Sequence, residues 1–419
     1  MEEKLTNKGG SWLGVFATRQ FWAFFGSGLI VSVAYIDPGN WATGIVAGSS
    51  FDFALLWVVW LASGMAMLFQ YLSGKIGVAG YSIAELVKLR WKNERLVFLY
   101  WLLSELAILG TDLAEFLGIV VALNLLFGIP LIVGAFISIL DVLLLLFLTR
   151  KSFRTLEYAF VLFVSAIGLA YVYEILIVRP PIAPIFYGSI LPILHQNMVF
   201  IAVGIIGATI MPHALFVHSW LTKNKVKSQK KTTSRWQLLK YHKADTIFSL
   251  AVAGIINAAI LIMAARAFYG IGIANVTIQQ AYQTLTPLFG VAASVVFAIG
   301  LLIAGIAASI TGTLAGQSIM DTLTSFRISL TTRRFITRGI NLVPILVAVI
   351  LKINPLNILV YSQVLLGFLI PLPLIPLVYY SSKREIMGDL ANTKVTIVVA
   401  TIFTMLILVL NFYLIYVSL

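Results

Sequence analysis

The sequence predicts an all-α polytopic membrane protein with eleven transmembrane helices. Of its 419 residues, 60% are hydrophobic and only 11% are charged, and the mean hydropathy is +0.99. Apolar runs of roughly 18 or more residues recur along the chain, and each is long enough to cross about 30 Å of hydrocarbon. Two of these runs are interrupted by proline. These observations leave no room for a separate soluble domain.

The predicted spans follow one another with short connections, so we expect neighbouring helices to alternate in direction. We place them at residues 21–48, 52–76, 97–126, 130–149, 155–177, 197–221, 246–268, 291–323, 336–353, 357–381 and 395–417. Residues 1–20 form a polar, charged segment before the first span. The stretch 223–243 is rich in lysine and is expected to be a solvated basic loop near lipid headgroups.

The basic residues predict the orientation. If the N-terminus is cytoplasmic, all but three of the 29 Lys and Arg residues fall on the inner side, the exceptions being Arg179, Arg266 and Lys352. Loops on the cytoplasmic side carry such an excess, which explains the net charge of +13 without nucleic acid as a partner. We therefore expect an integral protein of the plasma membrane with its N-terminus inside and its C-terminus outside. Cysteine is absent, which excludes disulfides and thiolate metal sites.

Five spans per half give the two halves opposite orientations. The first half covers residues 21–177 and the second covers 197–381, with residues 395–417 as an additional helix. This pattern is typical of transporters built from a 5+5 inverted repeat, whose substrate site lies near the midplane between the halves.

Both halves open with an interrupted helix. Asp37-Pro38-Gly39-Asn40 breaks the first span and Met211-Pro212-His213 breaks the sixth. Unpaired backbone groups cannot face hydrocarbon, so such breaks occur where they line a cavity or a site. The side chains offered are a carboxylate, an amide and a thioether, which suit a divalent transition metal better than Mg²⁺ or Ca²⁺.

Several segments, in order, resemble the signature segments of the Nramp family of proton-coupled divalent metal ion transporters, from about Phe21 to Asp389. The segments are Ala34 to Asn40, Gly207 to His213, Thr111 to Glu115, Ile139 to Leu143, Asp245 to Ala258, Ile310 to Gln317, and Ser362 to Val364. The resemblance implies a LeuT-type fold with helices 1 and 6 broken. It also implies Mn²⁺ or Fe²⁺ as transported substrate, Cd²⁺ as a further one, and no cofactor.

The resemblance also assigns metal ligands. They are the side chains of Asp37, Asn40 and Met211 and the backbone carbonyls of Ala34 and Ala208, and Gln363 approaches the metal in occluded states. Alternatives stay open for each residue. Asp37 and Asn40 can cap the half-helix that begins at Pro38, and a methionine in an apolar run is commonly a core residue.

A proton pathway is predicted beside the metal site. Asp112 and Glu115 share a face of the third span, and acids inside a membrane need protons or cations. Arg334 and Arg338 are their expected partners, and His213 is expected to move a proton or to take part in gating. The alternative is a static ion-pair clamp between helices.

The sequence departs from the family where Gly305-Ile306-Ala307-Ala308-Ser309 replaces a more polar stretch, so the polar lining of the pathway is thinner.

Alternative functions are an amino-acid symporter of the same fold, a magnesium-type relative and a non-transporting metal sensor. The sequence shows no arrangement of a nucleophile and a base that would indicate an enzyme. The expected partners are the metal ion, the proton and membrane lipid, with no obligatory protein partner.

Overall fold

The computed structural model describes residues 15–143, 153–229, 233–269, 279–280 and 291–418, and these residues form helices joined by short connections, with no strand among them. Eight of the described helical segments are long and apolar enough to cross a membrane. The predicted all-α membrane fold is confirmed. Residues 144–149, the end of the predicted fourth span, lie outside the described part.

Nine described helices lie between residues 19 and 190. They are α2 (Arg19–Phe24), α3 (Ser27–Ala34), α4 (Pro38–Phe51), α5 (Leu56–Ala79), α6 (Ile83–Arg90), α7 (Glu94–Phe127), α8 (Leu131–Ser138), α10 (Phe153–Val178) and α11 (Ile182–Ile190). The remaining described elements are η1 (Gln196–Met198), α12 (Val199–Thr209), α13 (Pro212–Lys227), α14 (Arg235–Phe268), α16 (Val291–Leu323), α17 (Leu330–Ile350), α18 (Pro355–Leu369), α19 (Pro371–Ser381), α20 (Arg384–Met387), η2 (Gly388–Leu390) and α21 (Lys394–Ser418).

Both predicted interruptions are present. The first lies between α3 and α4, and the second lies between α12 and α13. In a continuous helix, the Ala34 carbonyl would accept a hydrogen bond from residue 38 and the Ala208 carbonyl one from residue 212. Both of those residues are prolines, which have no N–H, so the two helices stop at matching places.

The structure corrects the predicted first span at one further break. The predicted first span is divided again at Gly26, whose φ of 132° is one that side-chain-bearing residues rarely adopt. The predicted tenth span, 357–381, is confirmed as one apolar segment, Pro355–Ser381, in which α18 and α19 are joined by Ile370, whose backbone conformation is helical.

The predicted basic loop is also corrected. Helix α13 extends to Lys227 and α14 begins at Arg235, so most of residues 223–243 is helical. The first turns of α14 are amphipathic, because Leu238, Leu239 and Tyr241 are buried while Lys240 is exposed. Packing of this apolar face extends α14 well beyond the membrane-like run that hydropathy detects.

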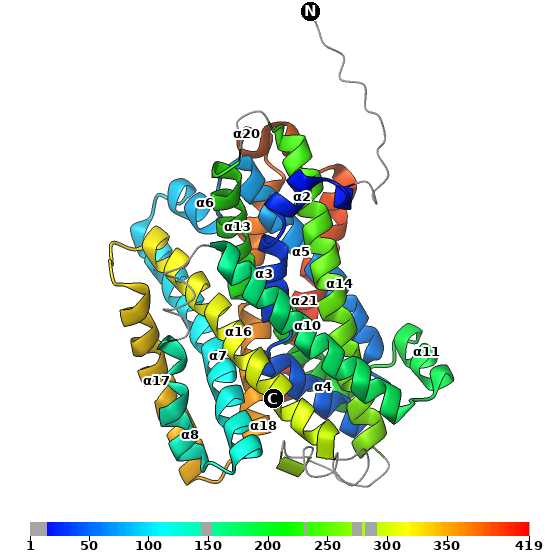
Figure 1. The fold of residues 1–419 in the computed structure, drawn as a ribbon. Helices are drawn as coiled ribbons and strands as arrows, with labels where there is room; N and C mark the ends of the chain where they lie inside the picture. The colour runs from blue at the N-terminus through cyan, green and yellow to red at the C-terminus, as the bar shows by residue number, and fades with distance from the viewer. Residues whose placement is uncertain (1–14, 144–152, 230–232, 270–278, 281–290, 419) are drawn as a thin grey trace, which may run out of the picture.

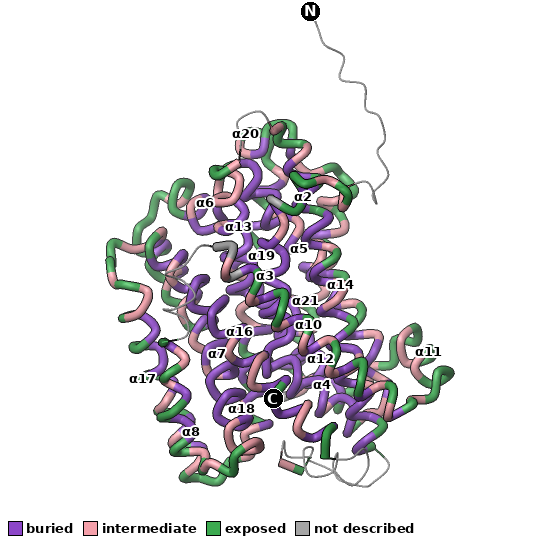
Figure 2. Tube along the Cα trace, viewed as in Figure 1, coloured by how far each residue is buried: buried purple, intermediate pink, exposed green. Residues whose placement is uncertain are grey.

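The outer faces of the bundle are apolar. Figure 2 shows the buried residues concentrated in the middle of the molecule and the exposed ones around it. Large apolar side chains are nevertheless exposed on the outer helices, including Tyr158 and Leu162 of α10 and Phe412 of α21. A continuous apolar exterior of this kind is what a surface in contact with lipid requires.

The interrupted helices lie at the centre of the molecule (Figure 1). Helix α14 packs against α3, α4 and α5, while α12 packs against α4, α5 and α18. Helices α7 and α16 pack against each other and form the other wall, with α8 and α17 beyond α7. The two breaks are therefore enclosed on all sides by other helices.

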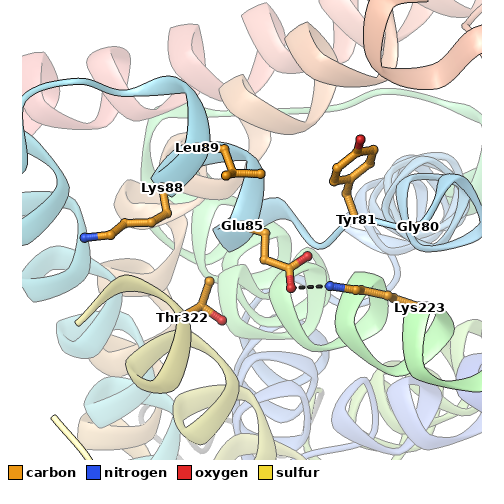
Figure 3. A pocket seen from close by; sticks show the side chains of 7 residues that line it. All are labelled: Gly80, Tyr81, Glu85, Lys88, Leu89, Lys223 and Thr322. Atoms are coloured by element: carbon orange, nitrogen blue, oxygen red, sulfur yellow. Dashed lines mark hydrogen bonds and ion pairs between the residues drawn. The ribbon is translucent and has the colours of Figure 1, made fainter. Parts of the chain in front are cut away.

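Polar contacts hold the helices together at the end where α2, α6 and α20 lie. Asp245 of α14 accepts hydrogen bonds through Oδ2 from the Gly26 N–H at 3.1 Å and the Gly28 N–H at 2.9 Å, so it caps α3. Glu85 of α6 forms an ion pair with Lys223 of α13, as Figure 3 shows. These contacts join α14 to α3 and α6 to α13 at this end.

Candidate metal site

The two helix breaks meet at Asn40. Its side-chain Nδ2 donates to the Ala208 carbonyl at 2.8 Å and to Asp37 Oδ1 at 2.8 Å. Its Oδ1 accepts from the Thr209 hydroxyl at 3.2 Å. Because Asp37 and Asn40 belong to the first break and Ala208 and Thr209 to the second, one amide side chain links the two halves of the protein.

Asp37 caps α4 with one carboxylate oxygen and leaves the other free. Oδ1 accepts from the Asn40 backbone N–H at 2.9 Å, as the capping alternative predicts. Oδ2 is buried and has no hydrogen-bond partner among the described residues. A buried carboxylate oxygen without a partner is costly, and a cation or a proton at this position would remove that cost.

Gln363 of α18 lies directly over the first break. A Cβ atom placed on Gly39 would overlap the Gln363 amide group and would come within 2.8 Å of Asp37 Oδ2. Gly39 is therefore required for the close approach of α18 to the free carboxylate oxygen. The Gln363 Oε1 atom is also buried and without a partner in the described part of the chain.

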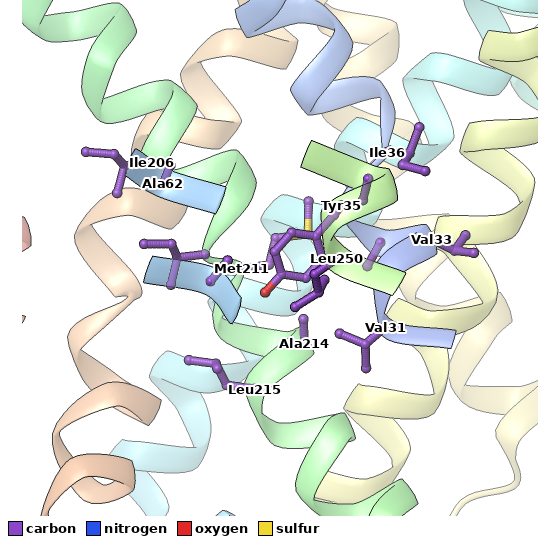
Figure 4. Packing of buried hydrophobic residues seen from close by; sticks show 14 of the residues in the cluster. Val31, Val33, Tyr35, Ile36, Ala62, Ile206, Met211, Ala214, Leu215 and Leu250 are labelled. Atoms are coloured by element: carbon purple, nitrogen blue, oxygen red, sulfur yellow. The ribbon is translucent and has the colours of Figure 1, made fainter. Parts of the chain in front are cut away.

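Met211 and the two freed carbonyls complete the predicted ligand set. Ala34, Ala208 and Met211 are each 0% exposed. Figure 4 shows Met211 inside a packed apolar cluster with Tyr35 and Ala214. Met211 is two residues from Thr209, whose hydroxyl contacts Asn40. The structure thus places all six predicted metal-site residues at or beside the two breaks.

Asn257 of α14 was given no role by the sequence analysis, yet it joins this site. Its Nδ2 donates to the Tyr35 carbonyl at 2.8 Å and to Asn40 Oδ1 at 3.3 Å, and its own Oδ1 has no partner among the described residues. The available signal was a lone amide within the apolar part of α14, where a polar side chain needs a partner.

Aromatic packing closes the site on the side of α4. The Trp41 ring lies one residue beyond Asn40 and is 2% exposed. Its ring centroid is 5.2 Å from that of Tyr171 and 5.1 Å from that of Phe297. The site residues are consequently shielded from solvent, which strengthens any electrostatic interaction within the site.

One stripe of α7 faces the breaks. Thr111, Glu115 and Gly118 are spaced so that they share a helix face. The Thr111 hydroxyl lies 3.1 Å from His213 Nδ1, and a Cβ on Gly118 would overlap the Pro38 ring. Glu115 therefore lies one turn of α7 from a contact with each break.

Asp112 belongs to a buried network on the neighbouring face of α7. It forms ion pairs with Arg334 and with Arg338, the latter at 3.2 Å, and accepts from Asn341 Nδ2 at 2.9 Å. Asp141, shortly after α8, forms ion pairs with the same two arginines. Two carboxylates thus compensate two guanidinium groups, which is the condition for burying such charges.

The expected pairing is confirmed for Asp112 and wrong for Glu115. Both Glu115 carboxylate oxygens are buried and without a hydrogen-bond partner among the described residues. The physical reason is that Asp141, which the sequence analysis did not connect with Arg334 and Arg338, occupies the remaining positions around the two guanidinium groups. Glu115 packs instead against Gly312 of α16.

The donor set combines one negative charge with neutral oxygen and sulfur donors. Among the described residues, no group of three or more His, Asp or Glu side chains gathers as a metal cluster would require. A site with a single carboxylate, carbonyl oxygens and a thioether can hold a divalent ion of intermediate softness and binds hard ions less well.

Comparisons with known proteins show the family. The model of the Nramp family, described as natural resistance-associated macrophage protein-like, matches residues 28–417. The chain is 38% identical over 405 residues to the divalent metal cation transporter MntH of Deinococcus radiodurans, covering 96% of this chain and 92% of that protein. It is 41% identical over 391 residues to MntH of Granulibacter bethesdensis, covering 93% and 87%.

Solved structures give the same result. A manganese transporter from Eremococcus coleocola has a TM-score of 0.85 at 32% identity, covering 94% of this chain and 87% of that chain. Mhp1, a nucleobase-cation-symport-1 family transporter, has a TM-score of 0.56 at 16% identity, covering 94% and 91%. The second likeness concerns the fold alone, and it agrees with the predicted LeuT-type fold.

The buried ion-pair network yields a stability prediction. Replacing Arg338 with Met should lower the free energy of unfolding by about 3 kcal/mol, because Asp141 then loses one of its two compensating charges in a buried setting. The measurement is thermal or denaturant unfolding in detergent. Arg384→Met, at an exposed arginine of α20, is the control and should change stability by about 0.5 kcal/mol or less. Equal stability of the two variants would contradict a structural role for the network.

Proposed function

This chain belongs to the Nramp family, and we propose that it imports divalent transition-metal ions, Mn²⁺ or Fe²⁺ and also Cd²⁺, together with protons. Its relatives named divalent metal cation transporters and a manganese transporter support this proposal. Transport would proceed by alternating access across the plasma membrane, with the N-terminus inside. The distribution of basic residues supports that orientation.

The observation that carries the proposal is Asp37 Oδ2, at the junction of the two broken helices, which has no hydrogen-bond partner among the described residues. The carboxylate lies beside two carbonyls, of Ala34 and Ala208, whose helical acceptor role is abolished by Pro38 and Pro212. A buried carboxylate oxygen without a donor among the described residues is a binding site for a cation, not for an anionic substrate group. This argues against the amino-acid symporter as an alternative.

Metal binding would require the Asn40 side chain to turn over. Its amide nitrogen is directed at Asp37 and Ala208, a position that a cation cannot share. A half-turn of the amide would aim its oxygen at the cation. The nitrogen could then donate to the Thr209 hydroxyl, and the Asn257 amide, whose Nδ2 donates to Asn40 Oδ1 at 3.3 Å, would have to turn as well. Metal binding would thus rearrange both the Asn40 and the Asn257 amide groups.

Proton coupling is proposed to involve Glu115. A divalent ion and a proton compete for the Asp37 carboxylate, so binding of the ion displaces a proton when Asp37 is protonated. Glu115 lies one helical turn from the Pro38 contact and has no ion-pair partner in the described chain. His213 adjoins the same α7 stripe through Thr111. The Asp112–Arg334–Arg338 network lies on the next face, and the proposed route leads from Glu115 toward it on the cytoplasmic side.

The function is tested by uptake of Mn²⁺ into proteoliposomes that contain no metal ion at the start. Purified wild-type protein should accumulate Mn²⁺, and Asp37→Ala should reduce accumulation to background, because the site then contains no formal negative charge. Asp389→Ala, at an exposed position in η2, is the control for the loss of a carboxylate and should transport normally. Normal uptake by Asp37→Ala in correctly inserted protein would overturn the assigned site.

Selectivity should depend on the thioether. Met211→Ala should keep part of the Mn²⁺ uptake, since the oxygen ligands remain, but Ca²⁺ and Mg²⁺ should compete more effectively than in wild type. Competition curves against Mn²⁺ uptake measure this change. Met65→Ala, an equally buried methionine of α5, controls for loss of packing. An unchanged competition profile in Met211→Ala would mean that Met211 only packs.

Coupling should depend on the Glu115 carboxyl. Glu115→Gln should lower metal-driven proton entry more than metal uptake, because the amide keeps the size and hydrogen-bonding shape but does not titrate. Internal pH and Mn²⁺ flux would be recorded together in proteoliposomes. Glu174→Gln, another buried acid on α10, is the control and should leave the ratio of the two fluxes unchanged. Equal losses of both fluxes in Glu115→Gln would assign the proton another route.

A further inference from the structure

A cavity of about 490 Å³ lies at the end of the molecule that the basic residues assign to the cytoplasm. It is formed where α6 meets α7 and where α16 ends. Its polar lining includes Lys88, Arg95, Thr324 and Ser325. The proposed metal site is enclosed deep in the bundle, whereas the residues lining this cavity are largely exposed, so the two sites are separate.

Two cationic side chains of the cavity are available to bind an anion. Within the described part of the chain, the side chains of Lys88 and Arg95 form no hydrogen bond or ion pair. The neighbouring Glu85 pairs with Lys223, and in Figure 3 the Lys88 side chain extends away from that pair. Glu94 is the one acidic residue of the lining, so the cavity keeps an excess of positive charge.

An aromatic rim adjoins the two cations. Phe98 and Phe326 line the cavity, and each is 51% exposed. The Trp101 ring lies between them, with centroids 5.2 Å from Phe98 and 5.6 Å from Phe326. The exposed side chains of Leu99 and Leu102 continue this apolar surface along α7. A basic cavity bordered by aromatic and aliphatic side chains matches the boundary between headgroups and acyl chains.

We propose that this cavity binds the headgroup of an anionic phospholipid from the inner leaflet. The phosphate would pair with Lys88 and Arg95, while the Ser325 hydroxyl would donate to the glycerol or ester oxygens. The acyl chains would lie along the rim of Phe98, Trp101 and Phe326. A free phosphate would satisfy the cations but would leave the aromatic rim unused, so the rim favours a lipid.

The bound lipid would act on α17 through Trp101. The Trp101 Nε1–H donates to Glu105 Oε1 at 3.0 Å, and Glu105 accepts from Arg333 Nη1 at 3.0 Å. Arg333 precedes Arg334, which belongs to the Asp112 network. A lipid that holds the Trp101 ring in place would stabilise this connection between α7 and α17. Its effect on transport rests on the proposed function, whereas its binding does not.

Binding is tested first on the full-length protein in detergent. Native mass spectrometry would compare phosphatidylglycerol with phosphatidylcholine at equal concentrations. Wild type should prefer phosphatidylglycerol, and K88Q/R95Q should weaken its binding by roughly fivefold for each basic side chain removed. The matched control is R90Q/K92Q, which removes two exposed basic residues from the same connection outside this cavity. Equal weakening in both double variants would show diffuse attraction and overturn the site.

The source of the phosphate is distinguished by two soluble probes. Inorganic phosphate and glycerophosphoglycerol would be added as competitors of phosphatidylglycerol, and neither should displace it at millimolar concentration. F98S/F326S should weaken binding of the lipid and leave any binding of the soluble probes unchanged. Displacement by inorganic phosphate, with no effect of F98S/F326S, would identify an anion site and overturn the lipid proposal.

Transport supplies the last readout. Proteoliposomes of phosphatidylcholine with and without phosphatidylglycerol should differ in the rate of Mn²⁺ uptake for wild type and for R90Q/K92Q. K88Q/R95Q should lose this difference. If no vesicle shows uptake, the proposed function fails while the mass spectrometry result still decides the lipid site. If uptake is equal in all vesicles despite specific binding, the proposed action through Trp101 is overturned.

Discussion

Backbone hydrogen bonding in hydrocarbon is the constraint on which the rest of this structure depends. A helix that crosses a membrane satisfies its own N–H and C=O groups, and a proline removes one donor. Pro38 and Pro212 do so four residues after Ala34 and Ala208. The chain buries both breaks against each other and surrounds them with α5, α7, α14, α16 and α18. The same breaks supply the oxygens of the candidate metal site.

The buried acids at and around the site are of two kinds, those paired with arginines and those without a cationic partner among the described residues. The network of Asp112, Asp141, Arg334 and Arg338 is internally compensated, which lets four ionic groups remain buried. Asp37 and Glu115 have no such compensation in the described structure. Uncompensated acids respond to a cation or a proton, whereas compensated ones hold helices together. The proposed transport chemistry therefore rests on the unpaired acids, with the paired ones as the frame.

Hydropathy predicted the existence and order of the spans well and their ends less well. It missed the break at Gly26, because hydropathy depends on side chains and does not report the backbone conformation of a glycine. It placed the start of α14 too late because its first turns are amphipathic and are stabilised by packing. The short helix α6 was not predicted, although the Ser82–Glu85 spacing in the sequence is that of a capping box. The repeat boundaries at 21–177 and 197–381 stay a prediction.

The sequence alone determined the membrane class, the two breaks and the chemical types of the candidate ligands, because periodic apolarity and proline act locally. Tertiary structure alone decided which polar atoms meet. It places Asn40 in contact with Ala208 and Asn257 and pairs Asp141 with Arg334 and Arg338. It leaves Glu115 without a hydrogen-bond partner among the described residues. Such pairings join residues more than a hundred positions apart, and several side chains compete for each partner. Their outcome depends on how whole helices pack, which no local pattern encodes.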